Sequence, residues 1–127
     1  MDKATRTHIR NILWSVKKIK KVLNNISNVV IDQKNVFLEY PVSNDSDTQW
    51  SVNQLVFHKM FLTIVEETLA NSPEQVTDIF TSKYLNGYPN KENALVASEV
   101  HLSESTIKRY DKEFLQEIAI RLGWLSV

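Results

Sequence analysis

Apolar residues recur every three or four positions through residues 4–30, which is the spacing of one face of an α-helix. The repeat runs from Ile9 through Val16 and Ile19 to Val30 and predicts one long amphipathic helix. Residues 32–50 break this period with a polar cluster, a short apolar run at 36–40 stopped by proline, and a polar loop over 43–48.

A second helix is predicted over about 50–71, where a broad apolar face that includes Leu55, Val56 and Met60 is typical of a central core helix. Ser72 followed by Pro73 predicts a capped start for a third helix over about 73–86. Gly87 suits a left-handed residue just after the end of that helix.

Two further helices are predicted over about 91–100 and 104–122. Gly123 ends the last of them, after which Trp124 and Leu125 fold back onto the bundle. The sequence therefore predicts an all-α fold of about five helices, with few glycines or prolines to interrupt them. An N-terminal helical part, 1–71, and a C-terminal part, 72–127, together form one compact domain.

The net charge is zero, yet its distribution is uneven. Residues 1–31 carry a balance of +6, residues 32–80 a balance of −6, and residues 81–127 equal numbers of both signs. Local fields decide where a polyanion docks. The basic residues of the first helix are therefore candidates for contact with phosphate or an acidic partner: Arg6, Arg10, Lys17, Lys18, Lys20 and Lys21.

Several classes of function are disfavoured by what the chain lacks. There is no Cys, and the three His show no metal-ligand spacing. With only Gly87 and Gly123, no glycine-rich phosphate loop forms. We therefore predict no enzyme, no metal site and no cofactor. No apolar run reaches the length of a membrane span and no signal peptide is visible, which predicts a cytoplasmic protein without a membrane partner.

Residues 96–110 carry the strongest functional signal. They predict two helices joined by a tight turn, with the small Ala97 at their crossing. The apolar residues predicted to pack the two helices together are Val96, Val100, Leu102 and Ile107. The second helix begins with polar and cationic side chains, as a helix entering a DNA major groove does. The candidate DNA-contacting residues are Ser103 (also the N-cap), Glu104, Ser105, Thr106, Lys108, Arg109 and Lys112.

The stretch from Tyr84 to Arg109 resembles region 4 of sigma-70-type factors. In that family a helix ends in a Gly-containing turn and is followed by the helix-turn-helix pattern I-A-x-x-L-G-[IV]-S-x-x-T-V-[KR]. Here Val96-Ala97 stands for Ile-Ala, Ser103 for the family serine and Thr106-Ile107-Lys108 for Thr-Val-Lys. His101 replaces the turn glycine, whose positive φ costs a residue with a side chain about 1 kcal/mol. His is among the more tolerant residues there.

The likeness covers about residues 73–121, so the earlier sigma regions have no counterpart. The size and layout of the chain also resemble the ArpU/RinA-type late-gene transcription regulators of phages and prophages. These resemblances imply a sequence-specific regulator that binds double-stranded DNA, and the analogy with region 4 adds RNA polymerase as a partner. Because one small module binds DNA with modest affinity, a second copy of the chain is the alternative further partner. Two alternatives stay open: a small terminase-type DNA-recognition subunit, and a helical protein-interaction module without DNA binding.

Overall fold

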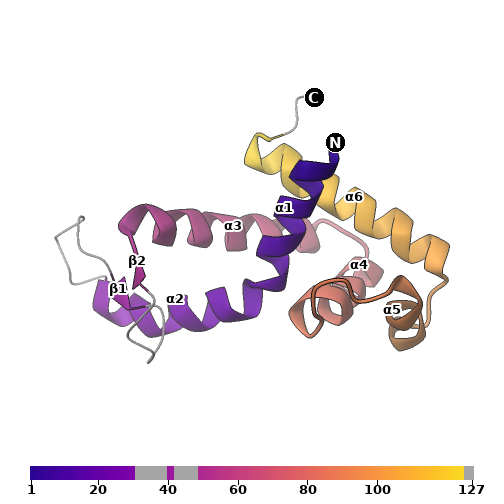
Figure 1. The fold of residues 1–127 in the computed structure, drawn as a ribbon, viewed down its shortest axis with the longest axis horizontal. Helices are drawn as coiled ribbons and strands as arrows, with labels where there is room; N and C mark the ends of the chain where they lie inside the picture. Colours follow the sequence, from indigo (N-terminus) through magenta and orange to yellow (C-terminus); the bar gives the residue numbers. More distant parts are fainter. Residues whose placement is uncertain (31–39, 42–48, 125–127) are drawn as a thin grey trace. The chain divides into compact units, whose positions relative to one another are not determined.

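The computed structural model of the chain describes residues 1–30, 40–41 and 49–124 (Figure 1). The helices are α1 (Lys3–Trp14), α2 (Val16–Val30), α3 (Val52–Ala70), α4 (Glu74–Phe80), the π-helical turn η1 (Thr81–Leu85), α5 (Asn93–Val100) and α6 (Glu104–Leu122). The predicted helical fold is therefore confirmed. Between α2 and α3, the two-residue strands β1 (Tyr40–Pro41) and β2 (Gln49–Trp50) form an antiparallel pair. The predicted apolar run at 36–40 falls mainly, and the loop at 43–48 wholly, outside the described residues.

Two compact units make up the chain. Unit 1 comprises Met1–Val16 and Ile64–Val127, and unit 2 comprises Lys17–Thr63. This division falls elsewhere than the predicted boundary at residue 72, and α3 contributes residues to both units.

The predicted single helix over residues 4–30 is wrong, because it is interrupted at Ser15. The Ser15 hydroxyl donates to the carbonyl of Asn11 at 3.2 Å, and its backbone N–H donates to the carbonyl of Ile12 at 2.9 Å. A serine that bonds back to the preceding turn competes with the regular helical ladder. The apolar period continues across this break and therefore concealed it.

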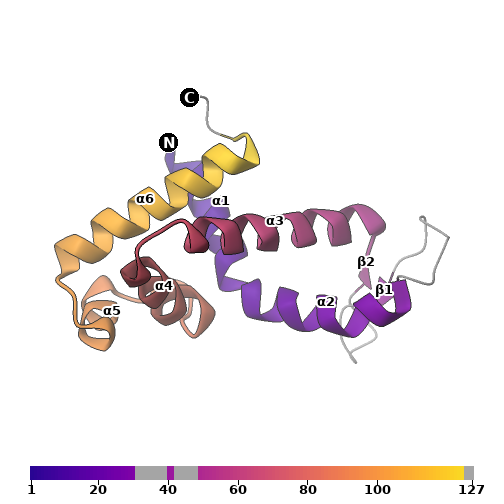
Figure 2. The same cartoon turned by 180° about the vertical axis from the view of Figure 1, so that it is seen from behind.

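In unit 1, α6 contacts α1, α4 and α5. Figures 1 and 2 show α5 beside the N-terminal half of α6, while α1 crosses the C-terminal half. Ile79, Val96 and Ile107, each at most 2% exposed, form the core cluster that joins α4, α5 and α6. At the other end of α6, the Trp124 ring stacks on His8 with 5.2 Å between ring centroids, as the predicted fold-back requires. Leu125 lies outside the described residues.

The start of α4 differs from the predicted cap. Pro73, not Ser72, is the N-cap residue, since the Ser72 hydroxyl donates to the carbonyl of Thr68 at 2.6 Å. After Phe80 the helix widens into η1, where the N–H of Asn86 donates to the carbonyl of Thr81 at 2.8 Å. The predicted helix over 73–86 is thus an α-helix followed by a π-helical turn.

Gly87 is required for a different reason from the predicted one. Among the described residues only Asn90, His101 and Gly123 have a positive φ, so the expected left-handed conformation of Gly87 is wrong. A Cβ placed on Gly87 would lie 1.9 Å from the carbonyl oxygen of Lys83. Glycine is needed here because the backbone of η1 leaves no room for a side chain.

The apolar face of α3 is narrower than predicted. Phe61, Ile64 and Val65 are buried, whereas Val56 is 61% exposed and Met60 44% exposed. The predicted burial of Val56 and Met60 is therefore wrong. The apolar character of these two side chains assigned them to the core, although they continue the spacing of three and four residues set by the exposed Asn53, Thr63 and Glu67, which places them on the solvent side of the helix.

Candidate functional site

The turn between α5 and α6 consists of His101, Leu102 and Ser103. His101 adopts the left-handed conformation, with φ 60° and ψ 41°, as the comparison with a turn glycine predicted. The N–H of Leu102 then donates to the carbonyl of Ala97 at 3.2 Å. This six-residue closure is the bond between the ends of a Schellman motif, and it ends α5 at Val100. Ala97 and Leu102 both pack against the core cluster, so the turn is anchored by apolar contact as well.

Ser103 caps α6, as predicted. Its hydroxyl oxygen accepts from the N–H of Thr106 at 3.2 Å and lies 2.7 Å from the Thr106 hydroxyl. Ser105 Oγ lies 3.2 Å from the same oxygen. Ser103 and Thr106 therefore build the start of the helix, and Thr106 is half-buried. Of the three hydroxyl-bearing candidates, Ser105 is exposed and takes no part in the hydrogen bond that caps the helix.

The cationic candidates lie along one exposed edge of α6. Ser105, Lys108, Arg109 and Lys112 are all exposed, and their spacing of three and four residues puts them on one helix face. We call these four residues the α6 outer face. The ion pairs found in the described part of the chain include none of its three cations. The Arg109 guanidinium carbon lies 5.0 Å from the centroid of the Tyr110 ring. Glu104 is exposed in the first turn.

The opposite side of α6 carries a charged residue that sequence reasoning missed. Asp111 is 2% exposed, and it accepts hydrogen bonds from three side chains. Tyr84 Oη donates to Asp111 Oδ1 at 2.6 Å, while Arg10 Nη2 and Lys83 Nζ donate to Oδ2 at 2.9 Å and 3.0 Å. Lys83 also donates to Asn93 Oδ1 at 2.9 Å. This Asp111 network connects α1, η1, α5 and α6. It therefore holds the helix that carries the outer face in place against its three neighbours.

Burial within the Asp111 network raises the pKa of Tyr84, and the negative charge of Asp111 raises it further. The Tyr84 hydroxyl is therefore a fixed hydrogen-bond donor rather than an acid near neutral pH. The sequence does hold a signal for the network: Asp111 lies four residues after Ile107 and four before Leu115, both of which are buried. A carboxylate at a core-facing position requires buried partners.

A second buried cation holds the loop before α5. Lys91 is 7% exposed, and its Nζ donates to the carbonyl of Ser82 at 2.8 Å and to Glu99 Oε2 at 2.8 Å. The Ser82 hydroxyl donates to the same carboxylate. The hydrogen bonds from Lys91 and Ser82 lower the pKa of Glu99. Through these contacts η1 and the loop are tied directly to α5.

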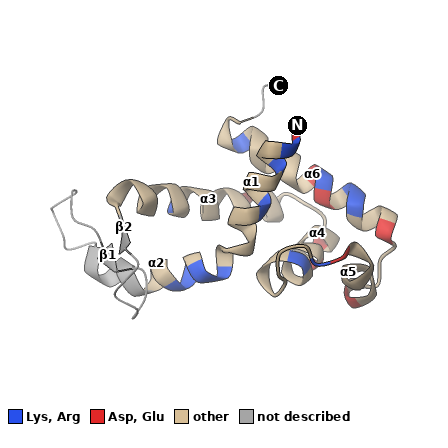
Figure 3. Ribbon diagram, in the orientation of Figure 1, with Lys and Arg blue, Asp and Glu red and all other residues tan. Residues whose placement is uncertain are grey.

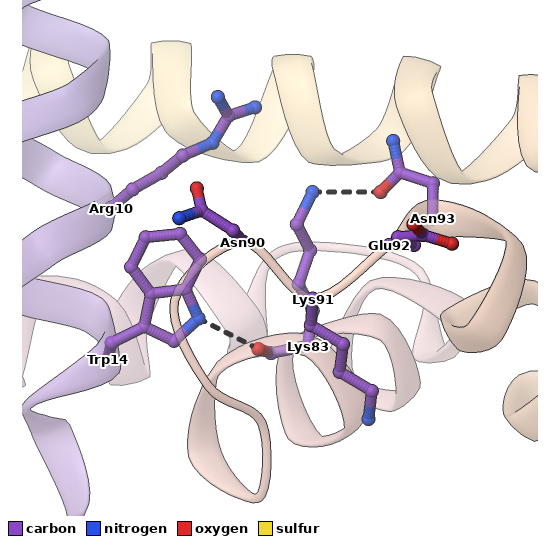
Figure 4. A pocket seen from close by; sticks show the side chains of 7 residues that line it. All are labelled: Arg10, Trp14, Lys83, Asn90, Lys91, Glu92 and Asn93. Atoms are coloured by element: carbon purple, nitrogen blue, oxygen red, sulfur yellow. Dashed lines mark hydrogen bonds between the residues drawn. The ribbon is translucent and has the colours of Figure 1, made fainter.

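A cavity of about 260 Å³ opens next to these groups (Figure 4). Trp14 forms part of its wall and is fixed by Nε1, which donates to the carbonyl of Lys83 at 3.0 Å. Arg10, Lys83 and Lys91 also line it; Arg10 and Lys83 share the carboxylate of Asp111, Lys91 is paired with Glu99, and Glu92 supplies a third negative charge. The cavity therefore offers no excess positive charge to an anion. Within the described residues no group of His, Cys, Asp and Glu is arranged to hold a metal ion.

The N-terminal basic candidates have different surroundings. Arg10 is bound to Asp111 inside unit 1, and Arg6 is half-buried. In unit 2, Lys17, Lys18 and Lys21 are exposed and Lys20 is half-buried. The predicted cationic face is therefore formed by the lysines of α2, and Arg10 is not part of it because its side chain is paired with Asp111.

No protein-family model, curated protein or solved structure matches this chain. None of the described helices combines the length and apolar character needed to cross a membrane. The features that bear on function are therefore the geometry of the α5–α6 corner and the charges around it.

Proposed function

We propose that this chain is a sequence-specific DNA-binding transcription regulator that inserts the N-terminal half of α6 into the major groove. The observation that carries the proposal is the α6 outer face, a set of exposed cations at the start of a helix held by a left-handed turn against α5. The major groove is about 12 Å wide and admits one α-helix. Free N–H groups at a helix start also favour nearby phosphates.

Each residue of the outer face has a distinct role in this proposal. Arg109 reads guanine, since its planar fork matches the two acceptors on the base edge. Lys108 and Lys112 bind phosphates, and Ser105 contacts a phosphate or a thymine methyl group. Glu104 accepts from cytosine or favours the helix N-terminus. Ser103 and Thr106 act by positioning, because their hydroxyls form the cap.

The resemblance to sigma region 4 extends the proposal to a late-gene activator of the ArpU/RinA type. In this role the partner besides DNA is RNA polymerase or a second copy of the chain. The residues in favour are the Val96-Ala97 pair, the Ser103 cap and Thr106-Ile107-Lys108. The left-handed His101 supports the same reading, since it takes the backbone conformation that the family glycine provides.

Selection of bound sequences from random DNA tests the proposal directly, and we expect a defined motif. Arg109→Ala should weaken binding to that motif by about 1–3 kcal/mol and relax the preference at one position. Lys112→Ala should weaken binding to all sequences alike. Lys59→Ala, which neutralises an exposed lysine of α3, is the matched control and should change neither property.

Absence of any enriched motif, together with no salt-dependent shift of duplex DNA, would overturn the proposal and favour a protein-interaction module. The native mass of the DNA-bound protein distinguishes a ring-forming terminase subunit from a monomer or dimer.

A further inference from the structure

α2 presents a cationic surface that the proposed docking of α6 does not use. Its residues are Lys17, Lys18, Lys20 and Lys21, which we call the α2 lysine face. From Lys3 to the end of α2 the sequence contains no acidic residue. Figure 3 shows this blue stretch of α2 without a neighbouring acidic residue on the same helix. In the described part of the chain, none of the four lysines takes part in an ion pair.

The geometry of α2 sets the lysines apart from its buried side. Lys17 and Lys21 are one turn apart, so they lie in line along the helix, with Lys18 and Lys20 on either side. On the opposite side, Ile19 is 2% exposed and Val22 1% exposed. Like charges one turn apart destabilise a helix, and a polyanion relieves that repulsion. The face is therefore suited to a ligand with closely spaced negative charges.

Two properties of the face select the kind of polyanion. A helix that binds at a membrane surface needs its apolar side free to enter the lipid, whereas Val16, Ile19 and Val22 are buried within the protein. The charged groups are all lysines, which bind phosphate as point charges without the paired hydrogen bonds that read a base or grip a carboxylate. This composition favours contact with a phosphate backbone over sequence reading.

We infer that the α2 lysine face binds backbone phosphates of the same DNA molecule whose bases α6 reads, and that it adds affinity without adding sequence preference. The inference rests on the proposed function. It assigns to unit 2 a share of the non-specific binding free energy, in addition to the phosphate contacts proposed for Lys108 and Lys112, and it leaves the sequence-specific part to unit 1.

The test is the salt dependence of binding to two labelled duplexes, one with the selected motif and one with the same bases scrambled. The variant Lys17→Gln/Lys21→Gln removes the two lysines at the centre of the face. Lys3→Gln/Lys59→Gln is the control, because it removes two exposed lysines that form no ion pair in the described part of the chain. Both variants change the net charge equally, and glutamine preserves helix propensity. Circular dichroism verifies their helix content.

Each phosphate contact contributes about 0.9 to the slope of log Kobs against log salt concentration. The slope of the lysine-face variant should therefore be smaller by about 1.8 on both duplexes. When the salt concentration is raised from 50 to 200 mM, the factor by which the affinity of this variant falls should be about 12-fold smaller than the factor for the native chain. The ratio of affinities for the two duplexes should stay the same. The control variant should retain the native slope.

An unchanged slope in the lysine-face variant, with Arg109→Ala still relaxing sequence preference, overturns this inference and leaves the proposed function standing. An equal loss in the control overturns it as well, since the effect would then belong to net charge. Lysine-dependent binding to phosphatidylserine vesicles with an unchanged slope on DNA would assign the face to a membrane instead. Failure of the native chain to bind either duplex removes the proposed function and this inference together.

Discussion

Replacing Asp111 with alanine tests the support of the α5–α6 corner. The substitution leaves Lys83, which is 6% exposed, without its carboxylate and deprives the Tyr84 hydroxyl of its acceptor. Removal of one partner from a buried ion pair typically costs about 3–5 kcal/mol, because the remaining charge stays desolvated. Small domains have a total stability of about 5–15 kcal/mol, so the loss should be a large fraction of it.

Urea denaturation followed by circular dichroism measures this loss. With a slope of about 2 kcal/mol per molar urea, the midpoint should fall by about 2 M. Glu113→Ala on the exposed side of the same helix is the control and should stay within about 0.5 kcal/mol of the native chain.

The double variant Lys83→Met/Asp111→Leu distinguishes the effect of the buried charges on stability from the effect of side-chain packing. Both buried charges are then gone, while the Arg10 side chain, 32% exposed, stays in contact with water. Apolar replacement of a buried ion pair is often neutral or stabilising. We therefore expect the double variant to be more stable than Asp111→Ala. A loss below about 1 kcal/mol in Asp111→Ala would refute the reasoning, since so small a value is typical of exposed pairs.

Two backbone positions give further predictions, both measured by chemical denaturation. His101→Gly should stabilise the protein by about 1 kcal/mol, because glycine adopts the left-handed conformation without steric cost; His101→Ala is the control and should give no gain. Gly87→Ala should destabilise it by about 3 kcal/mol, the upper end of overpacking costs, because the added methyl would meet the Lys83 carbonyl. Asn86→Ala is its exposed neighbour and should be nearly neutral. A neutral Gly87→Ala would show that η1 can move.

The helix-boundary signals of the sequence were reliable at the two ends of α6, whereas those at Ser72 and Gly87 were not. α6 begins and ends where predicted because Ser103 caps it within three residues and Gly123 adopts a left-handed conformation at its end. The left-handed conformation of His101 was expected from the comparison with the family's turn glycine. The break at Ser15 was missed, because the spacing of apolar residues shows which side of a helix is buried. It does not show that the Ser15 hydroxyl donates a hydrogen bond to the backbone of the preceding turn.

The candidate site was predictable only on its outer side. Exposed cations at the start of a helix can be read from spacing alone, and Lys108, Arg109 and Lys112 are indeed exposed. The partners of Asp111 come from positions up to 101 residues away in the chain, so their pairing is a product of the fold. Arg10 was assigned to the same cationic group as the lysines of α2, because sequence shows the charge of a side chain and not its partner.

The two sides of α6 therefore have different roles: the inner side stabilises the fold, and the outer side is the one proposed to bind DNA. Asp111 and Ile107 face inward and are buried, while Arg109 and Lys112 face outward and form no ion pair in the described part of the chain. Arg109→Ala should consequently keep the free energy of unfolding within about 0.5 kcal/mol of the native value, as is usual for exposed positions, while it alters DNA preference. Conversely, the Lys83→Met/Asp111→Leu variant should keep that preference if it folds. If Arg109→Ala unfolded the protein instead, a loss of DNA binding would report lost structure, and the outer face could not be assigned to base recognition.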